Sequence, residues 1–103
     1  RRAGDLAMPH ANRKDANHKA IREALRKVGA LVFDMADMPS AGFDLLVAYR
    51  AKLYILEVKA SDKQRDDLTA NENITRLALK GKGIRYEVVV SIDEAMKAIG
   101  AVR

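Results

Sequence analysis

The sequence has no cysteine and no tryptophan, and it has no apolar run approaching the roughly 18 residues of a membrane-spanning helix. The absence of cysteine excludes a disulfide framework, a cysteine nucleophile and zinc sites built on thiolates, so a metal would be held by oxygen or imidazole. Aromatic residues are also scarce, at three tyrosines and two phenylalanines, which disfavours a platform that stacks single-stranded bases. We expect a soluble intracellular protein with no membrane partner.

What is present fits one small globular domain. The chain has 103 residues, of which 49% are hydrophobic and 32% are charged. Lysine and arginine exceed the acidic residues, and the net charge of +5 favours a polyanionic partner such as nucleic acid. Basic ribosome-associated proteins share this charge balance, so charge alone does not identify the partner.

The order of the predicted elements is α-β-β-β-α-β-α. Residues 1–14 show no helical or strand period and are expected to form a flexible basic tail, leaving 15–103 as the single domain. The predicted helices cover residues 15–28, 69–80 and 92–99, and the predicted strands cover 31–33, 43–49, 53–59 and 85–90. Thr69 with Glu72, and Ser91 with Glu94, form capping boxes at two helix starts. A hairpin followed by a β-α-β crossover predicts an α/β fold, a mixed sheet flanked by helices.

Asp44 and Glu57 are the first candidates for chemistry. If Arg50 and Ala51 form a two-residue turn, Asp44 lies directly across from Glu57 on the same face, about 5 Å away. Two carboxylates at that distance repel each other, and a divalent cation such as Mg²⁺ relieves the repulsion. Lys59, on the same face, would stand beside a metal-bound water or a phosphate. A structural salt bridge is the alternative.

The turn itself leaves the register open. Arg-Ala is a poor sequence for a type I′ turn, and a three-residue loop would shift the pairing unless a bulge restored it.

Other polar residues could extend the site. Asn17 is centred on the apolar stripe of the first helix, where it would either hydrogen-bond a buried backbone group or orient a water ligand of the metal. His18, at the edge of that stripe, could contact substrate or simply pack. Glu72 and Arg76 are explained by helix capping and an i,i+4 pair, although Arg76 could also reach phosphate. Lys63 and Arg65 are further candidates for contact with a nucleic-acid backbone.

These pieces together resemble the PD-(D/E)XK nuclease superfamily, and within it the virus-type replication-repair nuclease branch (VRR-NUC), which includes small stand-alone phage proteins. The similarity is carried by Asp15-Ala16-Asn17-His18, Gly42-Phe43-Asp44-Leu45-Leu46-Val47, Leu56-Glu57-Val58-Lys59, Leu68-Thr69 and Ser91-Ile92-Asp93-Glu94-Ala95. Phe43 stands where the family usually has proline, and Glu72 and Arg76 stand where relatives often have glutamine and histidine.

The resemblance implies a restriction-endonuclease-like fold and a Mg²⁺-dependent DNA endonuclease, with Mn²⁺ as a substitute. Asp44, Glu57 and the Val58 carbonyl would be metal ligands, Lys59 would position or activate the attacking water, and Asn17 would complete the catalytic set. It further implies a homodimer that selects branched DNA such as a Holliday junction, in the cytoplasm of a bacterial or phage-infected cell. The rival interpretation is a non-catalytic nucleic-acid-binding module that keeps the fold.

Overall fold

The structure is a computed structural model and describes residues 9–102. Its helices and strands are α2 (Pro9–Lys27), β1 (Leu31–Asp34), β2 (Leu45–Tyr49), β3 (Lys52–Val58), α3 (Ala70–Gly81), β4 (Tyr86–Val89) and α4 (Ile92–Ala98). Two short 3₁₀ helices, η1 (Pro39–Ala41) and η2 (Asp62–Gln64), lie in the connections. The predicted α-β-β-β-α-β-α order is confirmed.

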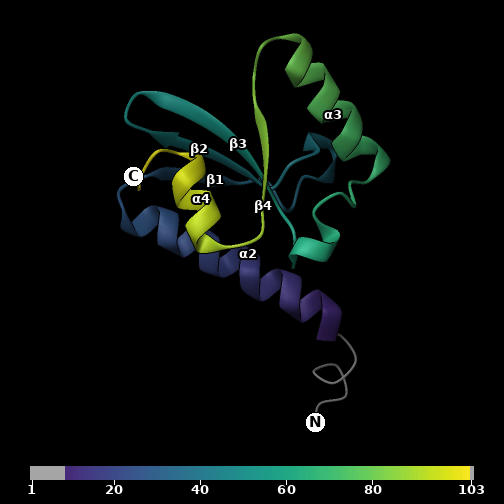
Figure 1. Cartoon of the computed structure of the whole chain (residues 1–103), viewed down its shortest axis with the longest axis horizontal. Helices are drawn as coiled ribbons and strands as arrows, with labels where there is room; N and C mark the ends of the chain where they lie inside the picture. The colour runs from purple at the N-terminus through teal and green to yellow at the C-terminus, as the bar shows by residue number, and fades with distance from the viewer. Residues whose placement is uncertain (1–8, 103) are drawn as a thin grey trace.

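The strands form one mixed sheet in the order β1-β2-β3-β4 (Figure 1). β1, β2 and β3 pair antiparallel, whereas β3 and β4 pair parallel and are joined by the crossover through α3. This is the α/β restriction-endonuclease-like arrangement expected from the sequence. Because β2 and β3 are antiparallel, the end of β3 and the start of β2 lie at the same end of the sheet.

The β2–β3 hairpin has the two-residue turn that the sequence analysis assumed. Tyr49 pairs with Lys52, and Arg50 and Ala51 both adopt positive φ angles of 49° and 68°. A type I′ turn requires this conformation at both central positions, and residues other than glycine or asparagine adopt it at a cost. The guanidinium of Arg50 lies 5.0 Å from the Tyr49 ring centroid, a cation–π contact that offsets part of that cost.

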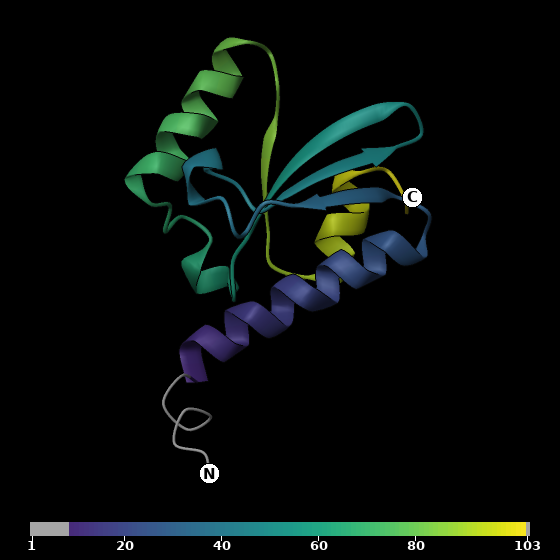
Figure 2. The ribbon, with the colours of Figure 1, turned by 180° about the vertical axis from the view of Figure 1, so that it is seen from behind.

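The hydrophobic core lies between one face of the sheet and helices α2 and α4. Its buried members include Ile21 and Leu25 from α2, Val47 and Leu56 from the central strands, and Ile99 after α4. α3 buries none of its residues and packs mainly against β4 and η1, so it stands apart from α2 and α4 (Figures 1 and 2). The second face of the sheet is therefore covered only in part.

The first helix begins earlier than predicted. Residues 1–8 of the expected tail lie outside the described residues, but residues 9–14 belong to α2, so the predicted helix start at Asp15 is wrong. Proline suits the first turn of a helix because the N–H that it lacks has no partner there. Once a helix has formed, it can extend without an apolar stripe, which is why hydrophobic periodicity missed this segment. No helix in the described part of the chain is long and apolar enough to cross a membrane.

Candidate active site

Asp44 and Glu57 meet where β2 begins and β3 ends. The Asp44 N–H donates to the Leu56 carbonyl at 3.1 Å, and Asp44 Oδ2 accepts a hydrogen bond from the Val58 N–H at 2.8 Å. Leu45, the residue after Asp44, pairs with Leu56, the residue before Glu57, so the two-residue turn brings both carboxylates to the same end of the sheet. Asp44 itself lies just outside β2, and these two bonds depart from the regular ladder. The Val58 N–H thereby orients the Asp44 carboxylate. A ligand role for the Val58 carbonyl stays a prediction.

Glu57 is the least satisfied group of the site. Its side chain is 0% exposed, and neither carboxylate oxygen has a hydrogen-bond partner within the described chain. Burial first, and then the negative charge of Asp44, raise the pKa of Glu57 to about 8. A buried carboxylate without hydrogen bonds costs several kcal/mol unless a cation compensates it. The sequence pattern indicated this burial, because Glu57 interrupts an apolar strand.

Lys59 supplies one nearby cation and is itself held by a second helix. Its Nζ lies 3.5 Å from Glu57 Oε2 and donates to Glu72 Oε1 at 3.0 Å. Burial lowers the pKa of Lys59, but Glu72 and then Glu57 outweigh it and leave the pKa above its ordinary value. Glu72 Oε1 also accepts the Thr69 N–H at 2.9 Å, completing the predicted capping box of α3. Glu72 is thus a site residue, a role that its capping function concealed in the sequence.

Lys14 supplies the second cation, from the first part of α2. Its Nζ lies 3.3 Å from Asp44 Oδ2 and 3.6 Å from Glu57 Oε2, and its side chain is 34% exposed. The ammonium therefore contacts both carboxylates. No sequence pattern indicated this contact, because residues 1–14 have no apolar periodicity and no helix was expected there to direct Lys14 toward the sheet.

Asn17 takes the backbone-bonding role of the two that the sequence allowed. Its Nδ2 donates to the carbonyls of Lys59 at 2.8 Å and of Val90 at 3.0 Å. These hydrogen bonds join α2 to the residues that follow β3 and β4. Asn17 thereby fixes the backbone from which the Lys59 side chain projects.

His18 lies beside this centre, in a network with Asp34 and Arg22. It is 8% exposed, and its Nε2 is 3.0 Å from Asp34 Oδ2, which also accepts from Arg22 at 2.6 Å. Burial raises the pKa of Asp34, but the Ala36 N–H, Arg22 and His18 together bring it down to about 2. His18 lines a groove that also includes Lys14 and Asp44. His18 therefore lies next to the carboxylates, but its ring contacts Asp34 and not Asp44 or Glu57.

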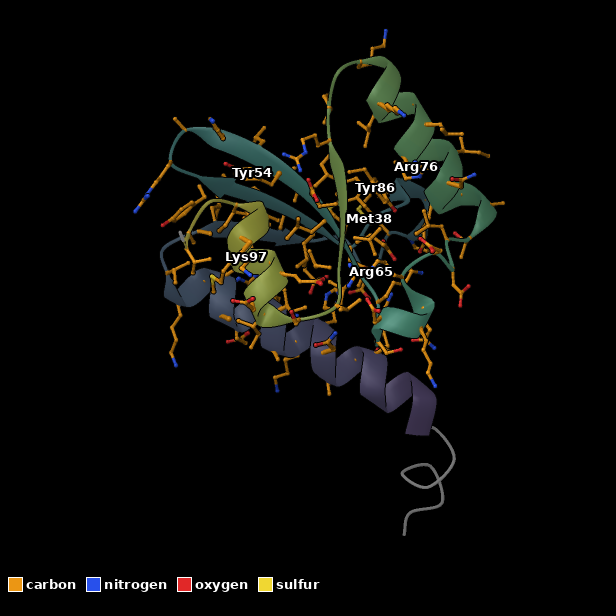
Figure 3. The ribbon with its side chains drawn as sticks, in the orientation of Figure 1. Met38, Tyr54, Arg65, Arg76, Tyr86 and Lys97 are labelled. Atoms are coloured by element: carbon orange, nitrogen blue, oxygen red, sulfur yellow. The ribbon has the colours of Figure 1, made fainter. Side chains whose placement is uncertain are left out.

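The remaining basic candidates lie outside the carboxylate centre. Arg65 forms ion pairs with Asp62 and Glu94, both at 2.7 Å. Arg76 donates to Asn73 at 2.9 Å, and Lys63 is exposed on η2. Figure 3 shows Arg65 and Arg76 on the side of the molecule where α3 and η2 lie.

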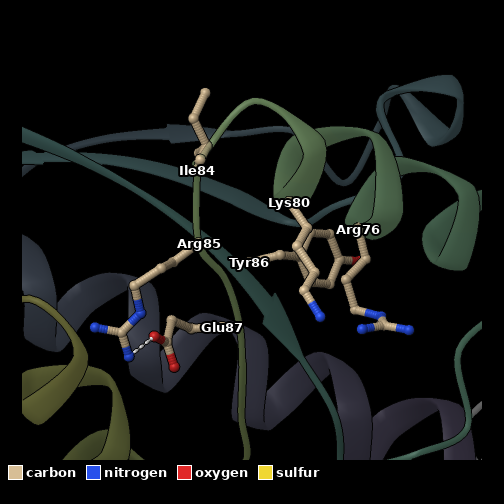
Figure 4. Close-up of a pocket in the computed structure, with 7 residues that line it drawn as sticks. Arg76, Lys80, Ile84, Arg85, Tyr86 and Glu87 are labelled. Atoms are coloured by element: carbon tan, nitrogen blue, oxygen red, sulfur yellow. Dashed lines mark ion pairs between the residues drawn. The ribbon is translucent and has the colours of Figure 1, made fainter.

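Tyr86 connects the centre to a second groove. Its hydroxyl donates to the carbonyl of Gly42, two residues before Asp44, at 2.7 Å. Its ring lines a pocket together with Arg76, Lys80 and Arg85, and the first two flank the ring in Figure 4. Nothing in the spacing of Tyr86 indicated this position, because it follows from the parallel pairing of β4 with β3.

The donors fit a divalent cation of the Mg²⁺ type. Asp44 and Glu57 provide the oxygens, and both oxygens of the buried Glu57 lack a hydrogen-bond partner in the part of the chain that the structure describes. Residues 9–102, as far as they are described, contain no group of three or more histidine, aspartate and glutamate side chains arranged as a metal site. Mg²⁺ needs only one or two carboxylates, since it keeps water and substrate phosphate as its other ligands.

Comparison with known proteins gives a likeness in fold. No family model matches the sequence, and no curated protein matches it. A solved structure described as a VRR_NUC domain superposes with a TM-score of 0.68 at 22% identity, covering 88% of this chain and 98% of that chain. The expected VRR-NUC resemblance is confirmed at the level of the fold, which is that of a nuclease-like domain.

Proposed function

We propose that this protein is a Mg²⁺-dependent nuclease that hydrolyses phosphodiester bonds in DNA. The observation that carries the proposal is the buried Glu57 carboxylate, which has no hydrogen-bond partner among residues 9–102 and lies near Asp44, with Lys59 beside it. A fold maintains such a costly arrangement where it serves a purpose. The nuclease-like fold and the positive net charge support the same conclusion.

Asp44 and Glu57, with the Val58 carbonyl, would hold the metal. When bound, Mg²⁺ supplies Lewis acidity toward a phosphate oxygen and lowers the pKa of water. Lys59 would place its ammonium against the negative charge that develops on the phosphate, and Glu72 would keep that ammonium in position. Asn17 would act through the Lys59 backbone.

DNA would be bound through its phosphates. Lys63 is exposed at the surface and Arg76 lines a pocket, so both can contact phosphate. Arg65 would first have to give up its ion pairs with Asp62 and Glu94. Phosphate contacts orient the substrate without reading its sequence, and so small a domain has little surface for base contacts. We therefore propose selection by DNA structure, with branched DNA such as a Holliday junction as the substrate.

Action as a homodimer would suit such a substrate. Ile74 and Leu77 on α3 are 64% and 52% exposed, and Phe33 and Leu53 on the second sheet face are 48% and 67% exposed. Large apolar side chains that remain this exposed favour a protein partner. A second copy of the chain would cover them and place two active sites about a twofold axis.

The test is cleavage of labelled duplex, flap, single-stranded and four-way-junction DNA in Mg²⁺, Mn²⁺ or EDTA. Lys59→Ala is the variant, and Lys27→Ala, an exposed lysine at the far end of α2, is the control. Metal-dependent products that vanish only in Lys59→Ala support the nuclease. Salt-dependent binding without products under any condition would instead identify the non-catalytic binding module.

A further inference from the structure

Lys14 occupies the space at which the two carboxylates converge. Its ammonium is within 3.3 Å of Asp44 Oδ2 and 3.6 Å of Glu57 Oε2. Glu57 lies in β3 and Asp44 directly precedes β2, whereas Lys14 comes from α2, so the contact forms only when helix and sheet are assembled. Because Glu57 has no hydrogen-bond partner in the described chain, this ammonium and that of Lys59 are its compensating charges.

A divalent cation held by the same oxygens would conflict with Lys14. Like charges a few ångströms apart repel strongly in a partly buried site. Lys59 has Glu72 as a further partner and can stay in place. The Lys14 ammonium would therefore be the cation that leaves.

The structure also gives Lys14 room to move. Lys14 lines two pockets, one shared with Asp44 and the other with Lys59, Gln64 and Asp67. Asp67 offers an exposed carboxylate toward which an ammonium can turn. Lysine suits such a movement, since it is a flexible point charge that is easily rehydrated.

We propose that Lys14 is an internal counter-cation, which holds Asp44 and Glu57 together in the metal-free protein and competes with the divalent metal for them. The inference rests on the proposed function, because it requires metal binding by these carboxylates. It assigns Lys14 a role in setting metal affinity. In the metal-free protein, the Lys14 ammonium supplies the positive charge that the metal supplies once it is bound.

The test measures Mn²⁺ affinity without DNA, by the electron paramagnetic resonance signal of free Mn²⁺. The proteins are the unaltered chain, Lys14→Met, Lys14→Arg and the control Lys27→Met. We expect Lys14→Met to bind Mn²⁺ roughly fivefold more tightly, the size expected for partly exposed ion pairs. Lys14→Arg keeps the charge and is expected to bind no more tightly than the unaltered chain, and Lys27→Met should match it.

Thermal melting supplies a second readout. In EDTA, Lys14→Met should melt at a lower temperature than the unaltered chain, and added Mn²⁺ should raise its melting temperature by more. Equal or weaker Mn²⁺ binding by Lys14→Met would overturn the inference. A different failure belongs to the proposed function: Mn²⁺ binding that is absent from the unaltered chain, or insensitive to Asp44→Asn, would show that the carboxylates hold no metal.

Discussion

Glu72 Oε1 accepts hydrogen bonds from Lys59 Nζ at 3.0 Å and from the Thr69 N–H at 2.9 Å, so one oxygen both positions the lysine and caps α3. The cap places the carboxylate at a fixed point of the helix N-terminus. The position of Lys59 therefore depends on a helix whose main packing contacts are with β4 and η1.

Glu72→Gln should reduce the rate of DNA cleavage while leaving Mn²⁺ affinity nearly unchanged. The amide would hold Lys59 less firmly, since it lacks the negative charge, but it can still accept the Thr69 N–H. We expect kcat to fall about tenfold, equivalent to the loss of roughly 1.4 kcal/mol of transition-state stabilisation. Thr69→Ala, which removes the other half of the capping box, is the control and should mainly cost about 1 kcal/mol of stability. An unchanged kcat would contradict the positioning role.

Glu57→Gln should separate activity from stability. Cleavage should be lost, yet in EDTA at pH 7 the variant should be more stable by on the order of 2 kcal/mol. Because burial raises the pKa of Glu57 to about 8, folding at pH 7 must either protonate this carboxyl or bury its charge, and glutamine removes that cost. Lys14 retains Asp44 and Lys59 retains Glu72 as partners. Asp44→Asn is the comparison, and it should not be stabilised, since the Asp44 carboxylate accepts the Val58 N–H. Urea unfolding measures the stability of both variants. A Glu57→Gln variant less stable than the unaltered chain would refute the idea that Glu57 is buried at a cost to stability.

The closeness of Asp44 and Glu57 was predictable because it depends on local rules. Strand alternation, a two-residue turn and an apolar strand interrupted by Glu57 suffice to bring the two carboxylates to the same end of the β2–β3 hairpin. The capping box of α3 was predictable for the same reason. The box predicted at α4 is only half correct: Ser91 Oγ accepts the Glu94 N–H, but the Glu94 side chain accepts the Val90 N–H rather than that of Ser91.

Lys14, Tyr86 and the Lys59 contact of Glu72 were not predictable in this way. Each depends on how an element packs in three dimensions. Lys14 depends on the first turns of α2, which extend beyond the sheet, and Tyr86 depends on the parallel pairing of β4 with β3. The Glu72 contact depends on the crossover that brings α3 back to the end of β3. Sequence spacing reports which residues share a face of one element. It does not report which face of another element stands opposite.

The ion pairs of Asp34 should make stability depend on pH in the acid range. Its pKa of about 2 lies below that of an unfolded aspartate, roughly 3.9, so its contribution is present above pH 4 and is lost as pH falls toward 2. The carboxylate is partly exposed, and about 1 kcal/mol is expected after solvent screening. Asp34→Asn should thus be less stable at pH 7, with a deficit that shrinks toward pH 2. Unfolding midpoints across this range would show a constant deficit if the pairs contributed nothing.

The apolar surface of α3 should control the oligomeric state. Leu77→Glu places a charge on a side chain that is 52% exposed and belongs to a helix that buries no residue. We expect the unaltered chain to be a dimer and the variant a monomer by light scattering. Lys82→Glu, an exposed residue just after α3, controls for the added negative charge. A monomeric unaltered chain would remove the homodimer from the proposed function.

Gly42→Ala tests whether the packing of α3 against Gly42 controls the active site. Gly42 has a φ of +75°, and a Cβ there would come within 2.8 Å of the Thr75 Cβ. Gly42 also accepts the Tyr86 hydroxyl and precedes Asp44 by two positions, so movement at this point disturbs both α3 and a proposed ligand.

We expect Gly42→Ala to lose about 2 kcal/mol of stability, from backbone strain together with overpacking. Cleavage should fall as well, because displacement of α3 carries Glu72 away from Lys59. Gly81→Ala is the matched control, because Gly81 is the last residue of α3, the helix that Gly42 contacts through Thr75. A Cβ added at Gly81 meets no atom within 4 Å, and alanine is a better helix former than glycine. Denaturant unfolding and cleavage assays on both variants decide the matter. If Gly42→Ala were as stable and active as Gly81→Ala, the contact between Gly42 and Thr75 would not hold the site together.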